Sequence, residues 1–170
     1  MKMDKIFQES LLHVCSLLNK NKVEYLTVGG TAVALYGYYR MSITVNGKPA
    51  EKPDLDFWYN PTYDNYYKLL QAIADMGVDV SRYKNEKNPN PKKSFFKLNF
   101  ELLTVDFIPE LPGLLKFNQS YLKKEVIILQ GTEIIFVDFD DLIENKLAIA
   151  REKDLEDVEE LKRIRNNNIL

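Results

Sequence analysis

Apolar residues recur at helical spacing near the start and in the middle of the chain. An amphipathic helix is predicted over residues 4–19, where apolar side chains follow one another at spacings of four, three and four (Phe7, Leu11, Val14 and Leu18). The same period predicts a helix over residues 63–76, with Gly77 as its stop. Near the end, Asp138 is the predicted N-cap of a helix through about residue 150, and Asp154 of a second helix through about residue 165.

Shorter β-rich runs separate these helices. Strands are predicted over residues 23–28, 54–59, 95–100, 102–108, 125–130 and 133–137, the last two forming a hairpin that turns at Gly131-Thr132. A short helix is predicted over residues 31–39, with Thr31 or Gly30 near its N-cap, and a loop over residues 41–53. This order indicates an α/β (α+β) domain spanning residues 1–170, in which helices flank a mixed β-sheet and residues 138–166 form a helical C-terminal segment.

The composition narrows the chemistry. One cysteine, Cys15, excludes an internal disulfide and a CxxC zinc site, and one histidine, His13, disfavours histidine-dependent catalysis. Chemistry would therefore rest on carboxylates, lysines and arginines. The net charge of −2 argues against a protein that coats DNA.

The lengths of the apolar runs and the N-terminal residues bear on where the protein is located. No apolar run approaches the roughly 20 residues of a membrane span, and polar residues interrupt the N-terminal apolar stretch, so we expect a cytoplasmic protein without a membrane partner.

Residues 82–97 carry six basic residues against one acid. This segment either gathers a polyphosphate or RNA through its charge or is a solvated surface loop, and we expect it to be mobile.

Gly29 and Gly30 stand between a predicted strand and a predicted helix. Backbone amides at such a junction favour an anion, and glycine lets a phosphate come close. The plainer interpretation is that two glycines at the end of a strand simply form a turn.

Three aspartates form the main candidate for a site. Asp54 and Asp56 are two positions apart on a predicted strand and so share one face, while Leu55 and Phe57 face the core. Asp106 interrupts an apolar strand, which marks either an edge position or a placed ligand. If the two strands pair, three carboxylates meet in an all-oxygen site suited to Mg²⁺ or Mn²⁺; otherwise Asp54 and Asp56 belong to a solvated strand face.

Together these motifs resemble the nucleotidyltransferase superfamily that includes DNA polymerase beta. Its pattern is a strand, a Gly-Gly or Gly-Ser, a short helix, a strand with Asp-x-Asp and a later strand with a third acid. The match here is Gly29-Gly30-Thr31, then Asp54-Leu55-Asp56, then Asp106. The second glycine replaces the serine of the polymerase-like branch, and residues 41–53 form an insertion.

A closer resemblance is to small bacterial AbiEii-type nucleotidyltransferases of abortive-infection systems. The stretch from Gly29 through Ala32, Val33 and Gly37 to Arg40 fits one of their motifs. A later lysine-bearing helix followed by Arg-x-Lys-Asp-x-x-Asp fits another, with residues Lys146, Arg151, Lys153, Asp154 and Asp157.

The resemblance implies transfer of a nucleoside monophosphate from a nucleoside triphosphate to an acceptor hydroxyl. Asp54, Asp56 and Asp106 would be catalytic and metal-binding, and the nucleotide would contact Gly29, Gly30, Thr31, Arg40 and Lys146. The acceptor (RNA, protein or small molecule) stays open, as does a protein antitoxin as partner. The alternative is a nucleotide-binding or toxin–antitoxin interaction module without catalysis.

Several roles in the C-terminal segment also stay open. Lys146 is either a phosphate contact or a surface lysine. Asp154 is an active-site acid or simply a helix N-cap, and Arg151 pairs with Glu144 or Asp154 or reaches a phosphate. The acids around Asp157 are expected on a solvated helix face.

Overall fold

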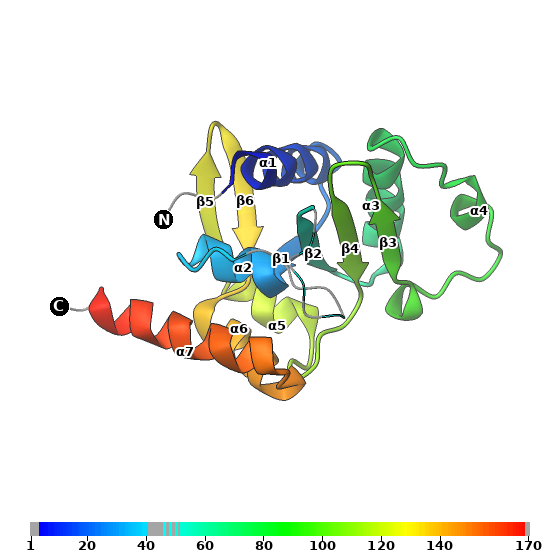
Figure 1. Cartoon of the computed structure of the whole chain (residues 1–170). Coiled ribbons are helices and arrows are strands. Elements are labelled where there is room, and N and C mark those ends of the chain that lie inside the picture. Colours follow the sequence, from blue (N-terminus) through cyan, green and yellow to red (C-terminus); the bar gives the residue numbers. More distant parts are fainter. Residues whose placement is uncertain (1–3, 41–45, 47, 49, 51, 169–170) are drawn as a thin grey trace.

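The computed structural model describes residues 4–40, 46, 48, 50 and 52–168. Six strands form one sheet in the order β3-β4-β2-β1-β6-β5 (Figure 1). Their bounds are β1 (Tyr25–Val28), β2 (Asp54–Tyr59), β3 (Phe96–Asn99), β4 (Thr104–Ile108), β5 (Glu125–Leu129) and β6 (Thr132–Phe136). The β1–β6 and β2–β4 pairs are parallel and the other three are antiparallel, which confirms the predicted mixed sheet.

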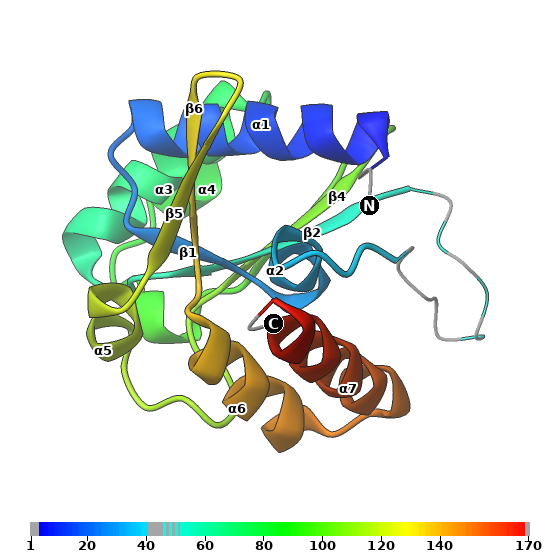
Figure 2. The same ribbon diagram turned by 90° about the vertical axis from the view of Figure 1, so that its left-hand side faces the viewer.

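Helices cover both sides of this sheet. Among the described residues they are α1 (Lys5–Lys20), α2 (Gly29–Leu35), α3 (Tyr63–Asp75), α4 (Ser81–Lys84), α5 (Phe117–Leu122), α6 (Phe139–Ile149), α7 (Glu152–Asn167) and the 3₁₀ turn η1 (Pro91–Lys93). Figure 2 shows α1 and α3 on one side of the strands and α2, α6 and α7 on the other. In the part of the chain described here, no helix is long and apolar enough to cross a membrane.

The apolar pattern of the sequence explains the core. The periodic residues of α1 are all buried, as predicted. In β2 and β4 the side chains of Leu55, Phe57, Val105 and Phe107 are fully buried, and the two phenylalanine rings stack with centroids 5.5 Å apart. Because alternate residues of a strand point to opposite faces, this packing directs the aspartates of β2 away from the core.

Helix starts differ from the sequence-based predictions at two positions. Helix α2 begins at Gly29 with Val28 as its N-cap, rather than near Thr31. The prediction that Asp154 is an N-cap is wrong: Arg151 is the cap of α7, and Asp154 lies three residues later, where its carboxylate accepts a hydrogen bond from the Arg151 backbone amide. The helix therefore begins at Glu152, and the Asp154 carboxylate lies in its first turn, where a negative charge stabilises a helix. Asp138 caps α6 as predicted, accepting from the Asp141 amide.

The connecting segments differ from the sequence-based predictions at two places. The basic segment over residues 82–97 contains most of α4, all of η1 and the first half of β3, so it is more regular than a loop; its mobility stays a prediction. Helix α5 was not predicted because its six residues are too few to show a period. The predicted loop over residues 41–53 lies for the most part outside the described residues.

Candidate active site

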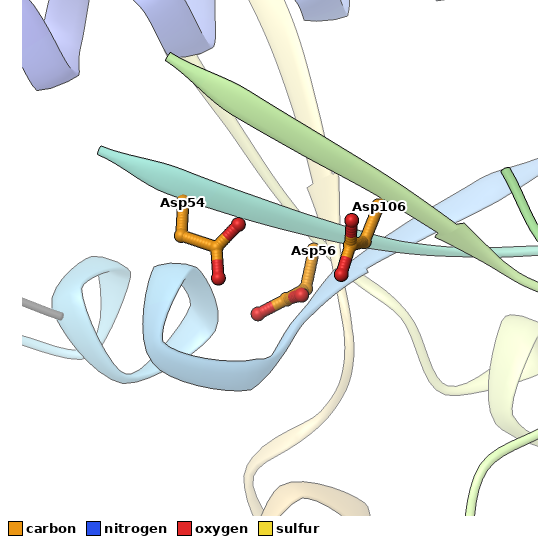
Figure 3. A group of neighbouring side chains, drawn as sticks. All are labelled: Asp54, Asp56 and Asp106. Carbon is orange, nitrogen blue, oxygen red and sulfur yellow. The ribbon is translucent and has the colours of Figure 1, made fainter. Parts of the chain in front are cut away.

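Three aspartates from two neighbouring strands converge on one face of the sheet. The parallel register of β2 and β4 places Asp56 directly beside Asp106. One carboxylate oxygen from each of Asp54, Asp56 and Asp106 lies within 4.8 Å of the other two, and Figure 3 shows the three side chains beside α2. Strand β4 lies between β3 and β2, so Asp106 is not an edge residue. The pairing on which the predicted acid cluster depended is therefore present.

The electrostatics of this cluster show why it fits a cation. Burial, followed by the charges of Asp54 and Asp106, raises the pKa of Asp56 to about 7. Burial also raises the pKa of Asp106, although Lys97, whose ammonium lies 3.3 Å away, opposes the shift. Oxygen Oδ1 of Asp106 is buried and has no hydrogen-bond partner among the described residues. Three carboxylates with one orphaned oxygen match the donor set that Mg²⁺ or Mn²⁺ takes in proteins.

Gly29 makes room for this cluster. It has a φ of +61°, and a Cβ added there would lie 2.4 Å from Oδ2 of Asp56. Gly30 differs, because a Cβ at that position would meet nothing within 4 Å. The next residue, Thr31, is buried and its hydroxyl donates to the Asp54 carbonyl at 3.4 Å. Gly29 thus serves the close packing of Asp56, and Gly30 faces open space.

Alanine at these two glycines should have opposite consequences. Gly29→Ala should lower the free energy of unfolding by about 2 kcal/mol, because it forces an alanine into the left-handed region and pushes Asp56 aside. Gly30→Ala should leave stability within about 1 kcal/mol, since its methyl group meets no neighbour. Urea unfolding of both variants provides the measurement. Equal losses at both positions would contradict this assignment.

The acids form one wall of a cavity of about 440 Å³. Gly29 and Gly30 also line it, together with residues from α6 and from the start of α7. Five cations face the acids: Arg40, Lys97, Lys146, Arg151 and Lys153. Such a cavity suits a ligand that carries several negative charges together with a metal ion.

A network of charges around two buried aspartates holds the cationic wall. Two atoms of the Arg40 guanidinium donate to the two carboxylate oxygens of Asp157, each at 2.6 Å. The Lys146 ammonium lies 2.9 Å from Asp154 and 2.8 Å from Asp157, and Arg151 donates to Asp154 at 2.6 Å. Both aspartates have no exposed surface. Helix α7 is therefore tied to α6 and to the segment after α2 through five charged groups.

One prediction for this region is wrong, that for Asp157, and the structure decides between alternatives that the sequence left open for Lys146 and Arg151. Lys146 is 3% exposed, so it is not a surface lysine. Asp157 lies under Arg40 and Lys146 instead of on a solvated helix face. Arg151 pairs with Asp154 rather than with Glu144.

Two lysines at the cavity had no predicted role. Lys97 is opposite Asp106 in the β3–β4 register, and the alternation of buried Phe96 and Leu98 around it is the signal that could have placed it there. Lys153 has no ion-pair partner among the described residues, and burial followed by the charge of Arg151 lowers its pKa.

Comparisons with known proteins give the fold. No family model and no curated protein sequence matches the chain. A solved structure of a proposed nucleotidyltransferase from Thermotoga maritima superposes with a TM-score of 0.55 at 17% identity, covering 98% of this chain and 96% of the other. The chain has a nucleotidyltransferase fold.

Two further solved structures agree with this fold. The lincosamide antibiotic adenylyltransferase LnuA, bound to lincomycin, gives a TM-score of 0.56 at 18% identity, over 92% of this chain and 97% of that chain. An antigenic nucleotidyltransferase-like protein from Paracoccidioides brasiliensis gives 0.51 at 10% identity, over 91% and 74%. At these identities the likeness extends to the fold and not to the substrates.

Proposed function

We propose that this protein is a metal-dependent nucleotidyltransferase, which moves a nucleoside monophosphate from a nucleoside triphosphate to an acceptor hydroxyl. The observation that carries the proposal is the convergence of Asp54, Asp56 and Asp106 beside a cavity with five cations. The nucleotidyltransferase fold of the solved structures supports it. A triphosphate needs both features, because its charge must be neutralised before an oxygen can attack phosphorus.

Each group of residues has a distinct part in this reaction. Asp54, Asp56 and Asp106 would hold Mg²⁺ or Mn²⁺, which, when bound, neutralises the triphosphate and stabilises the leaving oxygens. Asp106 orients the acceptor hydroxyl or takes its proton. Gly30 and Thr31 line the approach of the phosphates, and Gly29 keeps Asp56 in place.

The cations of the opposite wall bind the phosphates. Lys146 and Arg40 are fixed by Asp157, so they face the cavity in a preset geometry. Arg151 and Asp154 support Lys146, and Lys153 adds a positive charge that has no ion-pair partner among the described residues. Preset charges of this kind stabilise a transition state because they need no rearrangement during the reaction.

Nucleotide binding and transfer test the proposal in sequence. The protein should bind ATP, GTP, CTP or UTP in the presence of Mg²⁺ or Mn²⁺, measured by calorimetry. It should then release pyrophosphate or label an acceptor from a nucleoside triphosphate labelled at the α-phosphate. Binding without transfer to RNA, protein or small molecules would favour the non-catalytic module, and the absence of any metal-dependent nucleotide binding would sink the assignment.

Metal binding should be visible as a rise in melting temperature. A ligand that binds only the folded protein at a hundred times its Kd adds about 2.7 kcal/mol to the free energy of unfolding. Millimolar Mg²⁺ or Mn²⁺ should therefore raise the melting temperature, and Asp54→Asn should blunt the rise because one ligand is lost. Asp64→Asn, on the exposed side of α3, is the matched control. An unchanged melting curve of the wild-type protein would count against the site.

The stability of the metal-free protein should depend on pH through Asp56. Its pKa is about 7 in the folded protein and about 4 in an unfolded chain, so between these values folding takes up a proton. The stabilisation is fully present below about pH 4, and the free energy of unfolding falls as pH rises from about 4 to above about 7, where both states have lost the proton. Asp56→Asn should remove this component, measured as the difference between wild-type and variant urea unfolding at pH 5 and pH 8 in EDTA. An identical pH dependence in both proteins would refute it.

A narrower biological role follows from the Arg-x-Lys-Asp-x-x-Asp motif. We propose that the protein acts as an AbiEii-type toxin component with a protein antitoxin. The placement of Arg151 and Lys153 at the cavity, with Asp154 and Asp157 fixing its cations, supports this narrower role. Growth arrest upon expression of the wild-type protein, relieved by inactivation of the acid cluster, is its direct test.

A further inference from the structure

The two edges of the sheet differ in how they are protected. Strands β3 and β5 are the edges, and among the described residues each has one neighbouring strand (Figure 1). Strand β3 is short and alternates buried apolar residues with exposed Lys97 and Asn99, which disfavours pairing with a further strand. Strand β5 contains no proline, and its only charged residue, Glu125, is the first of the strand. An edge of this second kind is a template for another strand.

Strand β5 exposes apolar side chains on both faces of the sheet. Val126 is 42% exposed, Ile127 36% and Ile128 76%. Because neighbouring residues of a strand point to opposite faces, the exposed surface of Ile127 lies on one side of the sheet and that of Val126 and Ile128 on the other. A helix laid over one face would leave the other face in water, whereas a strand added to the edge covers part of both.

The turn after β5 determines which backbone groups are open. Both residues of Gln130-Gly131 have a positive φ, 49° and 79°, as in the two-residue type I′ turn of a hairpin. Such a turn follows a pair of residues that exchange both hydrogen bonds, here Leu129 and Thr132, and bonded pairs then alternate along the two strands. By this alternation, Val126 and Ile128 direct their N–H and C=O groups away from β6.

These open groups match those of a second copy of β5. When two antiparallel copies are paired about a two-fold axis at Ile127, Val126 of each copy is opposite Ile128 of the other, and their open N–H and C=O groups bond reciprocally. The side chains match as well, since Ile127 meets its own copy at the axis. At the rim Glu125 is opposite Leu129, so no like charges face one another. This register pairs the whole of β5 with itself.

We propose that the protein forms a symmetric dimer in which β5 pairs antiparallel with β5 of a second copy, so that two six-stranded sheets become one. A two-fold contact of this kind uses the open edge of both copies and leaves only the β3 edges, so assembly ends at two chains. Among the described residues, none from β5 or β6 lines the cavity beside the acid cluster, which therefore stays accessible in the dimer. The dimer does not depend on nucleotidyl transfer.

Charge substitutions at the two-fold axis test the pairing. In sedimentation equilibrium the mass of the full chain, 19.8 kDa as a monomer, should rise toward twice that value between about 1 μM and about 1 mM, which covers the affinities of small interfaces. Ile127→Lys and Ile127→Glu should each raise the dimer Kd by about tenfold or more, because like charges then oppose each other. An equimolar mixture of the two variants should restore dimerisation, since the introduced lysine faces the introduced glutamate. Leu115→Lys and Leu115→Glu, at a leucine that is 90% exposed outside β5, are the matched controls and should dimerise as the wild type does.

Amide hydrogen exchange measured by NMR tests the same register without any variant, and it decides the matter if the Ile127 variants do not fold. The amides of Val126 and Ile128 should exchange more slowly as the concentration of the wild-type protein rises, while the Ile127 amide, already bonded to β6, should change less. A chain that stays monomeric over this range, or folded Ile127 variants that dimerise alone or fail to dimerise when mixed, would overturn the proposal. Protection of the same amides only when a different protein is added would assign the edge to that protein and would equally overturn the dimer.

Discussion

Replacing Asp56 with alanine should reduce nucleotidyl transfer by about a thousandfold or more while the protein stays folded. Asp56 lies between Asp54 and Asp106, so its removal takes away the central ligand of the acid cluster. The loss of one preorganised electrostatic group typically lowers kcat by about 10²–10³, and here the loss also weakens the metal. Stability should not suffer, because the lost carboxylate is poorly solvated and is repelled by two others.

The measurement combines a rate with a melting temperature. Transfer is followed with a nucleoside triphosphate labelled at the α-phosphate, under saturating Mg²⁺ or Mn²⁺. The control is Asp64→Ala on α3, whose carboxylate pairs with Lys68 at the surface. If Asp56→Ala keeps more than a tenth of the wild-type rate while folded, the acid cluster is not the reaction centre.

The convergence of the three aspartates was predictable in part, because the apolar residues of each strand indicate which face its aspartates take. Leu55 and Phe57 must be buried on β2, so Asp54 and Asp56 take the opposite face. Asp106 is the one charged residue of β4, between buried Val105 and Phe107. The sequence did not show that β2 pairs in parallel with β4, because the register of two strands far apart in the chain depends on the whole sheet.

The cationic wall could not be derived in the same way. The sequence shows Asp157 among Glu156, Glu159 and Glu160, a run typical of a solvated helix. Its burial depends on where Arg40 lies, 117 positions earlier in the chain. The role of Gly29 was likewise hidden, because its close approach to Asp56 needs the β1–β2 pairing, in which Val28 is opposite Asp56. Local patterns thus predicted elements and faces, whereas contacts across the chain decided these roles.

Asp157→Asn should lower the free energy of unfolding by about 3–5 kcal/mol. Asp157 has no exposed surface and binds both Arg40 and Lys146, whose side chains are 17% and 3% exposed. Removing one partner of a buried ion pair leaves the other charges desolvated and uncompensated, which accounts for an effect of this size. Urea unfolding with EDTA present gives the value without a contribution from metal.

The control for Asp157→Asn is Glu160→Gln, three residues further along the same helix. Glu160 pairs with Arg163 at 2.6 Å, but the Arg163 side chain is 62% exposed, so the change should stay within about 1 kcal/mol. The folded fraction of Asp157→Asn should also bind nucleoside triphosphate more weakly, because Arg40 and Lys146 lose the group that orients them. A loss of stability with unchanged nucleotide affinity would mean that Asp157 has a structural role alone. Equal stability of the two variants would mean that the charge network does not stabilise the folded protein.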